Sequence, residues 1–337
     1  MKSYHLRPGA GIDGLTVREH DEPAPGPGRV LVRVRASSIS LRELLVLAGN
    51  YPLPVSPDIV PGCAGVGEVV AVGPGVTRVA PGDRVAATVF PDWIDGPFGL
   101  DLAAQLGSSR DGVFTEFALA DERALVHIPA HLSFAEAATL PLTAVTAWNA
   151  LTGGRAPMPG ETVLTLGTGG VSLFAVQFAK RSGARVIATT SGPDKAEHLR
   201  ALGADEVVDY RQHPRWGEEV RRRTGGLGVD RVVDVVGDLS QSLAATALGG
   251  EIAFVGHWLG SDAPGRTPSP GDFFTAGAVL RPLAVGSRAA FETMNRALDV
   301  WQARPTIHRE FGFDEIPQAL RHHAEGGFVG AVVVNHG

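Results

Sequence analysis

The sequence predicts an α/β protein in which a β-rich domain is joined to a domain built on a doubly wound parallel sheet. Three observations predict this fold class. Short β-like runs divided by Gly and Pro fill the first third of the chain, strand-like and helix-like segments alternate from about Ser133 onward, and a glycine-rich turn at 167–170 lies directly between a strand and a helix. The length of 337 residues agrees with two hydrophobic cores rather than one.

The first third contains three clear strand candidates, RVLVRVRAS at 29–37, GVGEVVAVG at 65–73 and DRVAATVF at 83–90. Each is apolar in alternation or throughout, and each is bounded by Pro and Gly turn residues. We therefore expect an antiparallel, partly closed β domain. The segment LRELLVLA at 41–48 predicts a short helix within it.

The pattern of apolar and polar residues changes at Ser133, which has Glu136 three residues later. This is the spacing of a capping box, so we expect a helix to begin there and to run over SFAEAATLPLTAVTAWNALT. Continuous apolar strands and amphipathic helices, the last of them LSQSLAATALGG at 239–250, then alternate to about residue 256, which is typical of a parallel sheet covered on both faces. The segment 261–272 predicts a loop, and the chain then predicts a strand, a helix and a final strand, VLRPLAVGS, FETMNRALDVWQA and FVGAVVVN.

Composition and charge narrow the classes of partner. A formal net charge of -6 gives no global positive field for nucleic acid or anionic lipid. The N-terminus has no apolar core of signal-peptide length and no apolar run has the length of a membrane span, so we expect a cytoplasmic protein with no membrane or nucleic-acid partner. Cys63 is the only cysteine, which excludes an intrachain disulfide and a thiolate-based structural zinc site.

The turn after the strand TVLTLG has the pattern G-x-G-x-x-S, with Gly167, Gly169 and Ser172 at the defining positions. The first glycine permits the tight turn, the second lets the backbone approach a pyrophosphate, and the small third residue lets the helix pack on the strand. Free N–H groups at the helix start favour phosphate. A ligand-free turn is the alternative, but the succession of strand–helix units around it favours a dinucleotide site that includes Gly167, Thr168, Gly169, Gly170 and Val171.

The end of the second strand, ARVIATT, predicts which dinucleotide binds. A carboxylate there would hold the ribose hydroxyls of NAD and repel the extra phosphate of NADP. Thr190 and Ser191 occupy this place, and Lys195 follows. Hydroxyls and an ammonium suit a phosphate, so we expect NADPH, although Asp194 beside the lysine weakens the argument.

Together these features resemble the medium-chain dehydrogenase/reductase superfamily, and within it the zinc-independent quinone oxidoreductase-like branch. The resemblance covers essentially the whole chain and depends on GRVLVRVRASSISLREL, PGCAGVGEVVAVGPGVTRVAPGDRV, LPLTAVTAWNAL and GTGGVSLFAVQFAKRSGARVIATT. It implies a GroES-like catalytic domain made of residues 1–122 and 304–337, a Rossmann NADP-binding domain over 123–303, and hydride transfer from the nicotinamide to a carbonyl compound. It also implies a homodimer or higher homo-oligomer, through strand alignment near residues 258–285.

The resemblance assigns further cofactor residues. Tyr210 and Lys195 match residues that contact the 2′-phosphate, and Thr146 matches a threonine near the nicotinamide. Val255 and Gly256 end the strand EIAFVG, at the edge where doubly wound sheets bind ligands, and belong to the same predicted site.

The zinc positions of the family are altered here. Where zinc-dependent relatives have cysteine, histidine and cysteine ligands, this chain has Ser40, Cys63 and Leu142. Catalytic zinc needs about three strong N, S or carboxylate ligands, so no metal is expected. Without a Lewis acid, conjugated acceptors such as quinones and enones are favoured, because their charge spreads as the hydride arrives.

Candidate catalytic residues follow from the same comparison. Ser40 could donate to the substrate oxygen or the nicotinamide ribose, and Tyr51 is either a proton donor or a loop anchor. His257 is either a proton donor or a loop residue, while Trp93 and Trp258 are expected to shape the substrate pocket. Three further residues are expected to be structural, with Arg42 and Glu43 forming a surface or interdomain pair and Cys63 filling the core.

The sequence thus predicts a zinc-independent, NADPH-dependent reductase of a quinone, enone or related small carbonyl compound. An alcohol dehydrogenase or ketone reductase that uses protein hydroxyls is one alternative, and a tailoring enzyme with one bulky substrate is another. A third is an NADPH-binding regulator without catalysis, because the asparagine and tyrosine of many quinone oxidoreductases are replaced by Ser40 and Leu45.

Overall fold

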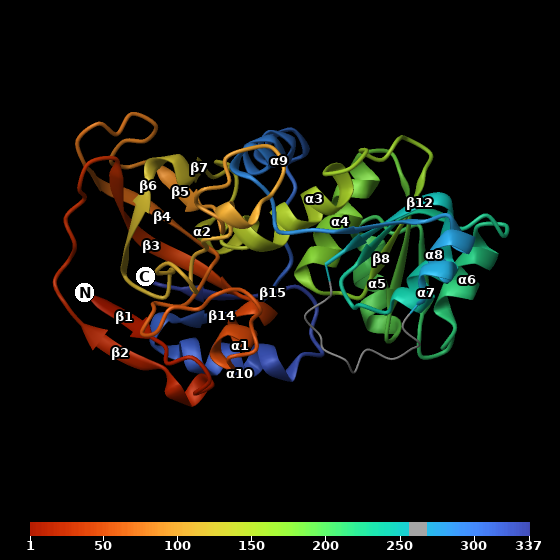
Figure 1. Ribbon diagram of the computed structural model, residues 1–337, viewed down its shortest axis with the longest axis horizontal. Helices are drawn as coiled ribbons and strands as arrows, with labels where there is room; N and C mark the ends of the chain where they lie inside the picture. The colour runs from red at the N-terminus through yellow and green to blue at the C-terminus, as the bar shows by residue number, and fades with distance from the viewer. Residues whose placement is uncertain (256–267) are drawn as a thin grey trace. The chain divides into compact units, whose positions relative to one another are not determined.

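The computed structural model describes residues 1–255 and 268–337 and divides into two compact units (Figure 1). The first unit contains residues 1–145 and 285–337, and the second contains residues 146–284. The elements of the first unit are β1 (Lys2–His5), β2 (Thr16–Glu19), β3 (Arg29–Ile39), α1 (Leu41–Leu47), β4 (Gly65–Val72), β5 (Arg84–Ala87), β6 (Phe117–Asp121), β7 (Leu125–His127), α2 (Phe134–Ala137), α9 (Arg288–Trp301), β14 (Ile307–Gly312), α10 (Ile316–Glu325) and β15 (Ala331–Asn335). Those of the second are α3 (Val145–Thr152), β8 (Thr162–Leu166), α4 (Gly170–Arg181), β9 (Arg185–Thr190), α5 (Pro193–Ala201), β10 (Glu206–Asp209), α6 (Trp216–Arg223), β11 (Val229–Asp234), α7 (Leu239–Ala245), β12 (Thr246–Phe254), α8 (Pro270–Ala276) and β13 (Val279–Pro282).

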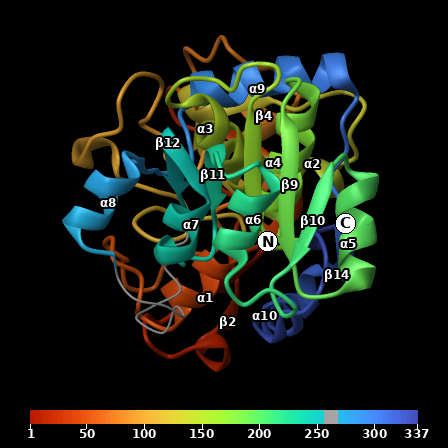
Figure 2. The same ribbon diagram turned by 90° about the vertical axis from the view of Figure 1, so that its right-hand side faces the viewer.

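The second unit is built on one parallel sheet of six strands in the order β10-β9-β8-β11-β12-β13. The order reverses between β8 and β11, which makes this the doubly wound arrangement that the sequence predicts. Helices α4 and α5 pack on strands β8 to β10, while α6 and α7 pack against each other and on β10 to β12. Figure 2 looks onto this unit, with α6 and α7 in front of the strands.

The parallel register brings distant segments to one edge of this sheet. Leu166 pairs with Thr189, and Asp234 pairs with Phe254. The turn after β8, the end of β9, the loop after β11 and the end of β12 therefore share the carboxyl edge, where open α/β sheets bind their ligands.

The first unit contains a seven-stranded sheet in the order β14-β15-β3-β4-β5-β7, with β6 also paired to β3. All pairs except β14–β15 are antiparallel, which confirms the predicted β-rich domain. The register of β3 against β4 shifts twice, and such bulges bend a strand so that a sheet can curl. Helices α1 and α10 contact each other, and Leu47 and Leu320 belong to the same apolar core.

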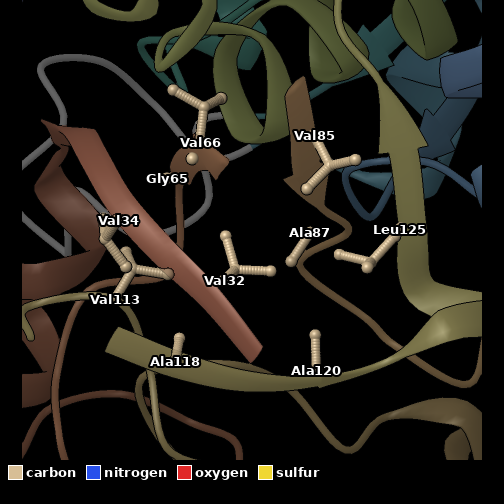
Figure 3. Close-up of a pocket in the computed structure, with 11 residues that line it drawn as sticks. Val32, Val34, Gly65, Val66, Val85, Ala87, Val113, Ala118, Ala120 and Leu125 are labelled. Carbon is tan, nitrogen blue, oxygen red and sulfur yellow. The ribbon is translucent and has the colours of Figure 1, made fainter. Parts of the chain in front are cut away.

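A small cavity of about 20 Å³ lies inside the curled sheet of the first unit (Figure 3). Its lining is entirely aliphatic or glycine and includes Val32, Val85 and Leu125. A cavity of this size holds at most one water and offers it no polar side chain. It is therefore a packing void of the curled sheet and not a place for a substrate.

Two predicted helices differ from the observed elements. The helix expected over 133–152 begins at the confirmed capping box of Ser133 and Glu136, but it divides into α2, a π-helical turn at Leu140–Ala144, and α3. Pro141 has no N–H group to donate and so interrupts the regular ladder. The segment LSQSLAATALGG stops being helical at Ala245, because β12 begins at Thr246 and pairs with β11.

Two further boundaries also differ from the sequence-based ones. The loop expected over 261–272 ends earlier, because α8 begins at Pro270 behind a capping box of Ser269 and Asp272. The compact units place residues 123–145 and 285–303 with the first unit, whereas the predicted nucleotide domain includes them. The predicted boundaries follow the resemblance to the family and not the compactness of the two units. The domain boundaries 1–122, 123–303 and 304–337 therefore stay a prediction.

Candidate functional site

The turn between β8 and α4 has the geometry that a dinucleotide pyrophosphate needs. Gly167 has φ +78°, a region that favours glycine, and its N–H donates to the Thr189 carbonyl at 3.0 Å. A Cβ added at Gly167 or Gly169 would meet no atom within 4 Å, so the space above the turn is open. Helix α4 begins without a side-chain cap, which leaves its first N–H groups for an anion.

The third position of the motif acts as predicted. The Ser172 side chain is buried, and its hydroxyl donates to the Leu166 carbonyl at 2.6 Å, which holds α4 against β8. Thr168 is buried, whereas Gly169 is exposed and Gly170 and Val171 are partly exposed. The predicted cofactor residues of this turn therefore surround one uncapped helix end, and they fit a dinucleotide.

The candidate 2′-phosphate residues come together at the ends of β9 and β10. The Tyr210 N–H donates to the Thr190 carbonyl at 3.0 Å, so the two strand ends lie side by side. Tyr210 is exposed, and Ser191 and Lys195 are partly exposed. Within the described ranges the Lys195 ammonium has no ion pair or hydrogen bond, so a positive group is free beside this edge. Thr190 differs, because its hydroxyl is buried and has no hydrogen-bond partner in the described structure.

Asp234 is a site residue that the sequence reasoning missed. It ends β11 at the carboxyl edge and is fully buried, with its carboxylate accepting from the N–H groups of Val236 and Gly237 and from the Ser242 hydroxyl. Burial raises the pKa of Asp234, while these three hydrogen bonds act in the opposite direction. The carboxylate fixes the loop after β11, and the turn-like spacing Asp234-Val-Val-Gly237 was the available signal.

Among the remaining predicted cofactor and site residues, the structure describes Val255 and Thr146. Val255 follows β12, and its N–H donates to the Asp234 carbonyl at 2.8 Å, which places it at the same edge. Gly256, His257 and Trp258 lie outside the described residues. Thr146 is buried on α3.

Ser40 in the first unit is the N-cap residue of α1 and is bound to Glu43. The Ser40 N–H and hydroxyl both donate to Glu43 Oε2, at 2.9 and 2.5 Å, and the Arg42 N–H donates to the Ser40 hydroxyl at 3.2 Å. The second carboxylate oxygen, Oε1, accepts from the Cys63 N–H at 3.1 Å. The Ser40 hydroxyl therefore donates to Glu43 in this structure, and its role toward a substrate stays a prediction.

Arg42 and Glu43 are not the surface pair that the sequence suggests. The Glu43 side chain is 1% exposed and the Arg42 side chain 9%, with Nη1 and Oε1 3.7 Å apart. The Arg42 guanidinium donates to Gln105 and Tyr51 and lies over the Tyr51 ring. These long-range contacts bury a charged pair that is adjacent in sequence on a short helix.

Tyr51 is held within this cluster. Its hydroxyl donates to Gln105 Oε1 at 2.8 Å and accepts from Arg42 Nε at 3.2 Å. Burial raises the pKa of the Tyr51 phenol, while Arg42 lowers it. These contacts favour the loop-anchor interpretation, and a role as proton donor stays a prediction.

Trp93 is also enclosed. The indole is 7% exposed, its N–H donates to the Gly96 carbonyl at 2.9 Å, and its ring packs against Phe90 and Phe98. Its polar group is therefore satisfied inside its own loop, and its contribution to a substrate pocket stays a prediction.

Cys63 is fully buried, as the core interpretation expects. Burial raises the pKa of its thiol well above the usual value, and the neighbouring Glu43 carboxylate raises it further, while Arg42 opposes them. We expect the native protein to react negligibly with a thiol reagent such as Ellman's reagent over an hour, and to release one equivalent of thiolate after unfolding in guanidinium. Rapid reaction of the native thiol would contradict this arrangement.

The residues at the family's zinc positions do not fit a catalytic zinc. Ser40 is hydrogen-bonded to Glu43, burial raises the pKa of the Cys63 thiol and so opposes the thiolate that zinc binds, and Leu142 offers no ligand atom. Across residues 1–255 and 268–337, no three His, Cys, Asp or Glu side chains form a group that could hold a metal ion. The same ranges contain no helix that is both long and apolar enough to cross a bilayer.

Comparison with known proteins supports the two-domain organisation. A family model described as the alcohol dehydrogenase GroES-like domain matches residues 26–130, and one described as zinc-binding dehydrogenase matches residues 170–300. The expected pair of a GroES-like and a Rossmann domain is confirmed.

The individual relatives are named for two different activities, alcohol dehydrogenase and quinone oxidoreductase. The chain is 37% identical to the zinc-type alcohol dehydrogenase-like protein C1773.06c of Schizosaccharomyces pombe, over 96% of both chains. It is 34% identical to a crystal structure of an NAD-dependent alcohol dehydrogenase, covering 100% of both chains with a TM-score of 0.88. A quinone oxidoreductase of Pseudomonas syringae pv. tomato is 27% identical, with 99% of both chains covered and a TM-score of 0.83.

Proposed function

We propose, because this chain belongs to the medium-chain dehydrogenase/reductase superfamily of oxidoreductases, that it is a zinc-independent, NADPH-dependent reductase of a quinone, enone or related small carbonyl compound. The assignment of NADPH depends on the open glycine turn and the uncapped start of α4. The free ammonium of Lys195 and the exposed Tyr210 lie at the neighbouring strand ends of the same sheet edge. The proposal of a zinc-independent site depends on the hydrogen bonds that join Ser40, Glu43 and Cys63 at the family's metal positions.

The proposal gives each residue of the site a role. The backbone N–H groups of the turn and of α4 bind the pyrophosphate, and Lys195 and Tyr210 bind the 2′-phosphate. Bound NADPH supplies the hydride. Asp234 holds the loop after β11 at the same edge. Conjugated acceptors suit this site, because they spread the developing charge over several atoms.

An alcohol dehydrogenase or ketone reductase is the second candidate function. One relative is named a zinc-type alcohol dehydrogenase-like protein, and another an NAD-dependent alcohol dehydrogenase. The Ser40 hydroxyl also donates to a carboxylate, an arrangement suited to accepting the proton of an alcohol. An NADPH-binding regulator that lacks catalysis is the remaining alternative.

The test is oxidation of NADPH by chelator-treated protein with a quinone, a simple enone and a saturated ketone in parallel, and with NADH as the comparison. We expect turnover of the quinone or enone, little turnover of the ketone, and a preference for NADPH. Ketone activity that appears only after zinc is added would contradict the metal-free site. Binding of NADPH without turnover of any acceptor would favour the regulator.

The edge strand of the second unit supports self-association. Strand β13 ends the parallel sheet, and Leu248, Phe274 and Val279 nearby are 83%, 89% and 55% exposed. An exposed edge with apolar neighbours is suited to pairing with another copy. We expect a homodimer by light scattering, and a monomer after Val279→Lys, with Val300→Lys on α9 as an exposed control that leaves the dimer intact. A monomeric wild-type protein would contradict this proposal.

A further inference from the structure

Two histidines of the first unit face each other at the surface. His308 lies on the edge strand β14 and His322 lies on α10, which contacts that strand (Figure 1). Their Nε2 atoms are 3.1 Å apart, and their rings are parallel to within 5°. A separation of 3.1 Å leaves room for one proton at most between the two nitrogens, so at least one Nε2 atom presents a lone pair.

The backbone of β14 places His308 at this position. The pairing of β14 with β15 changes register between Ile307 and Arg309, so His308 is the extra residue of a β-bulge and has no partner residue on β15. Such a bulge turns one side chain to a new direction while the ladder on either side holds the strand. His308 is exposed and the His322 side chain is 24% exposed, so an ion reaches both rings from solvent.

Phe328 and Glu325 hold the two rings in orientation. The Phe328 ring is inclined by 15° to His308 and by 16° to His322, with centroids 4.8 and 5.6 Å away. Glu325 Oε2 lies 3.6 Å from His322 Nδ1. A carboxylate at Nδ1 favours the tautomer with its proton there, which leaves the lone pair on Nε2. Arg309 brings an opposing charge, but its guanidinium lies over the Phe311 ring at 4.6 Å.

We propose that His308 and His322 bind a divalent transition-metal ion, Cu²⁺ or Zn²⁺, through their Nε2 atoms. Two nitrogens about 2.0 to 2.1 Å from one metal, at an angle of about 90° to 109°, are about 2.8 to 3.4 Å apart, a range that includes the observed 3.1 Å. Imidazole nitrogen suits these ions, whereas Mg²⁺ and Ca²⁺ prefer oxygen ligands. The ion takes the place of the proton between the rings, and water fills its remaining positions. Two protein ligands give a weaker site than the four of a structural zinc site.

This site goes beyond the proposed reductase function and does not depend on it. Its ligands are not the residues at the family's metal positions, and binding of the ion requires neither NADPH nor an acceptor. Metal binding is therefore measured without cofactor or acceptor, and a failure of this proposal is distinguishable from a failure of the reductase function.

The experiment is a calorimetric titration of chelator-treated protein with Cu²⁺, with electron paramagnetic resonance of the bound copper. The chain has 11 histidines, so the site is defined by comparing variants. We expect the wild type to bind one equivalent more tightly than any other, with hyperfine splitting from two nitrogens. Loss of an outer partner of a metal ligand already costs about 10- to 100-fold in affinity, so His308→Gln or His322→Gln should weaken that equivalent by at least about 100-fold.

Two further variants complete the comparison. His127→Gln is the matched control, because His127 is an exposed histidine that pairs with Asp83, and it should bind Cu²⁺ as the wild type does. Glu325→Gln keeps both ligands and should weaken the tight equivalent by about tenfold. Circular dichroism of the metal-free variants checks their fold, and if one histidine variant folded poorly, the other and Glu325→Gln would still decide.

The outcome that would overturn the proposal is a tight equivalent of Cu²⁺ that survives in a folded histidine variant. A wild type that binds no equivalent more tightly than the double variant His308→Gln/His322→Gln would overturn it as well.

Discussion

Replacing Arg231 by methionine is expected to lower the free energy of unfolding by about 3 to 5 kcal/mol, the usual effect of breaking a buried charged network. Arg231 lies on β11 and is 3% exposed, yet its guanidinium donates to the carbonyls of Ala150, Leu151 and Arg155. The first two belong to the last turn of α3, where carbonyl groups have no partner within the helix. Methionine has a similar length but no donor, so the Leu151 carbonyl would lose this hydrogen bond inside the protein, while the Ala150 carbonyl would keep the one from Arg281.

A neighbouring charge adds to this effect. Glu251 lies 3.5 Å from Arg231 and 2.8 Å from Arg281, so loss of Arg231 leaves it with one cation instead of two. Unfolding in urea, followed by circular dichroism, would measure the change. Arg222→Met on α6 is the control, because that arginine is exposed and, among the residues that the structure describes, forms its ion pair with Glu219 of its own helix. An Arg231 variant with the stability of the Arg222 variant would show that water satisfies the carbonyls.

The elements of the second unit were predictable because their signals are local. An apolar run such as TVLTLG at 162–167, followed by glycines and then an amphipathic segment, indicates a strand, a turn and a helix without knowledge of distant residues. The parallel order of the strands confirms that interpretation. The same reasoning placed the helix start at Ser133, because a capping box lies within four residues.

The cluster around Glu43 was not predictable in this way. A charged pair such as Arg42-Glu43 on a short helix usually lies in solvent, and only the packing of Gln105, Tyr51 and the segment at Cys63 over it reverses that expectation. Asp234 was missed for another reason, since its local signal, the turn-like spacing Asp234-Val-Val-Gly237, does not distinguish a buried loop anchor from a surface residue. Burial depends on contacts between segments 20 to 63 residues apart, which a local pattern does not contain.

Two glycine-to-alanine substitutions in the glycine turn are expected to separate an effect on cofactor binding from an effect on stability. Gly169 has φ −73°, which any residue adopts, and a Cβ there meets no protein atom within 4 Å. Gly169→Ala should therefore keep the stability of the wild type to within about 1 kcal/mol, because a less flexible unfolded chain offsets the poorer N-cap. Its methyl group would nevertheless stand where the pyrophosphate must approach the backbone.

We expect Gly169→Ala to weaken NADP⁺ binding by about tenfold to 100-fold, because each hydrogen bond to a charged group that is lost costs about 1.5 to 3 kcal/mol. Gly167→Ala provides the opposite pattern. The φ of +78° strains any residue with a Cβ, so this variant should lose about 1 to 2 kcal/mol of stability even without ligand. Calorimetric titration with NADP⁺ and thermal unfolding of the unliganded variants would measure the two effects separately. If Gly169→Ala bound NADP⁺ as tightly as the wild type, the phosphate could not lie against this turn, and the assignment of the cofactor site to β8 and α4 would be wrong.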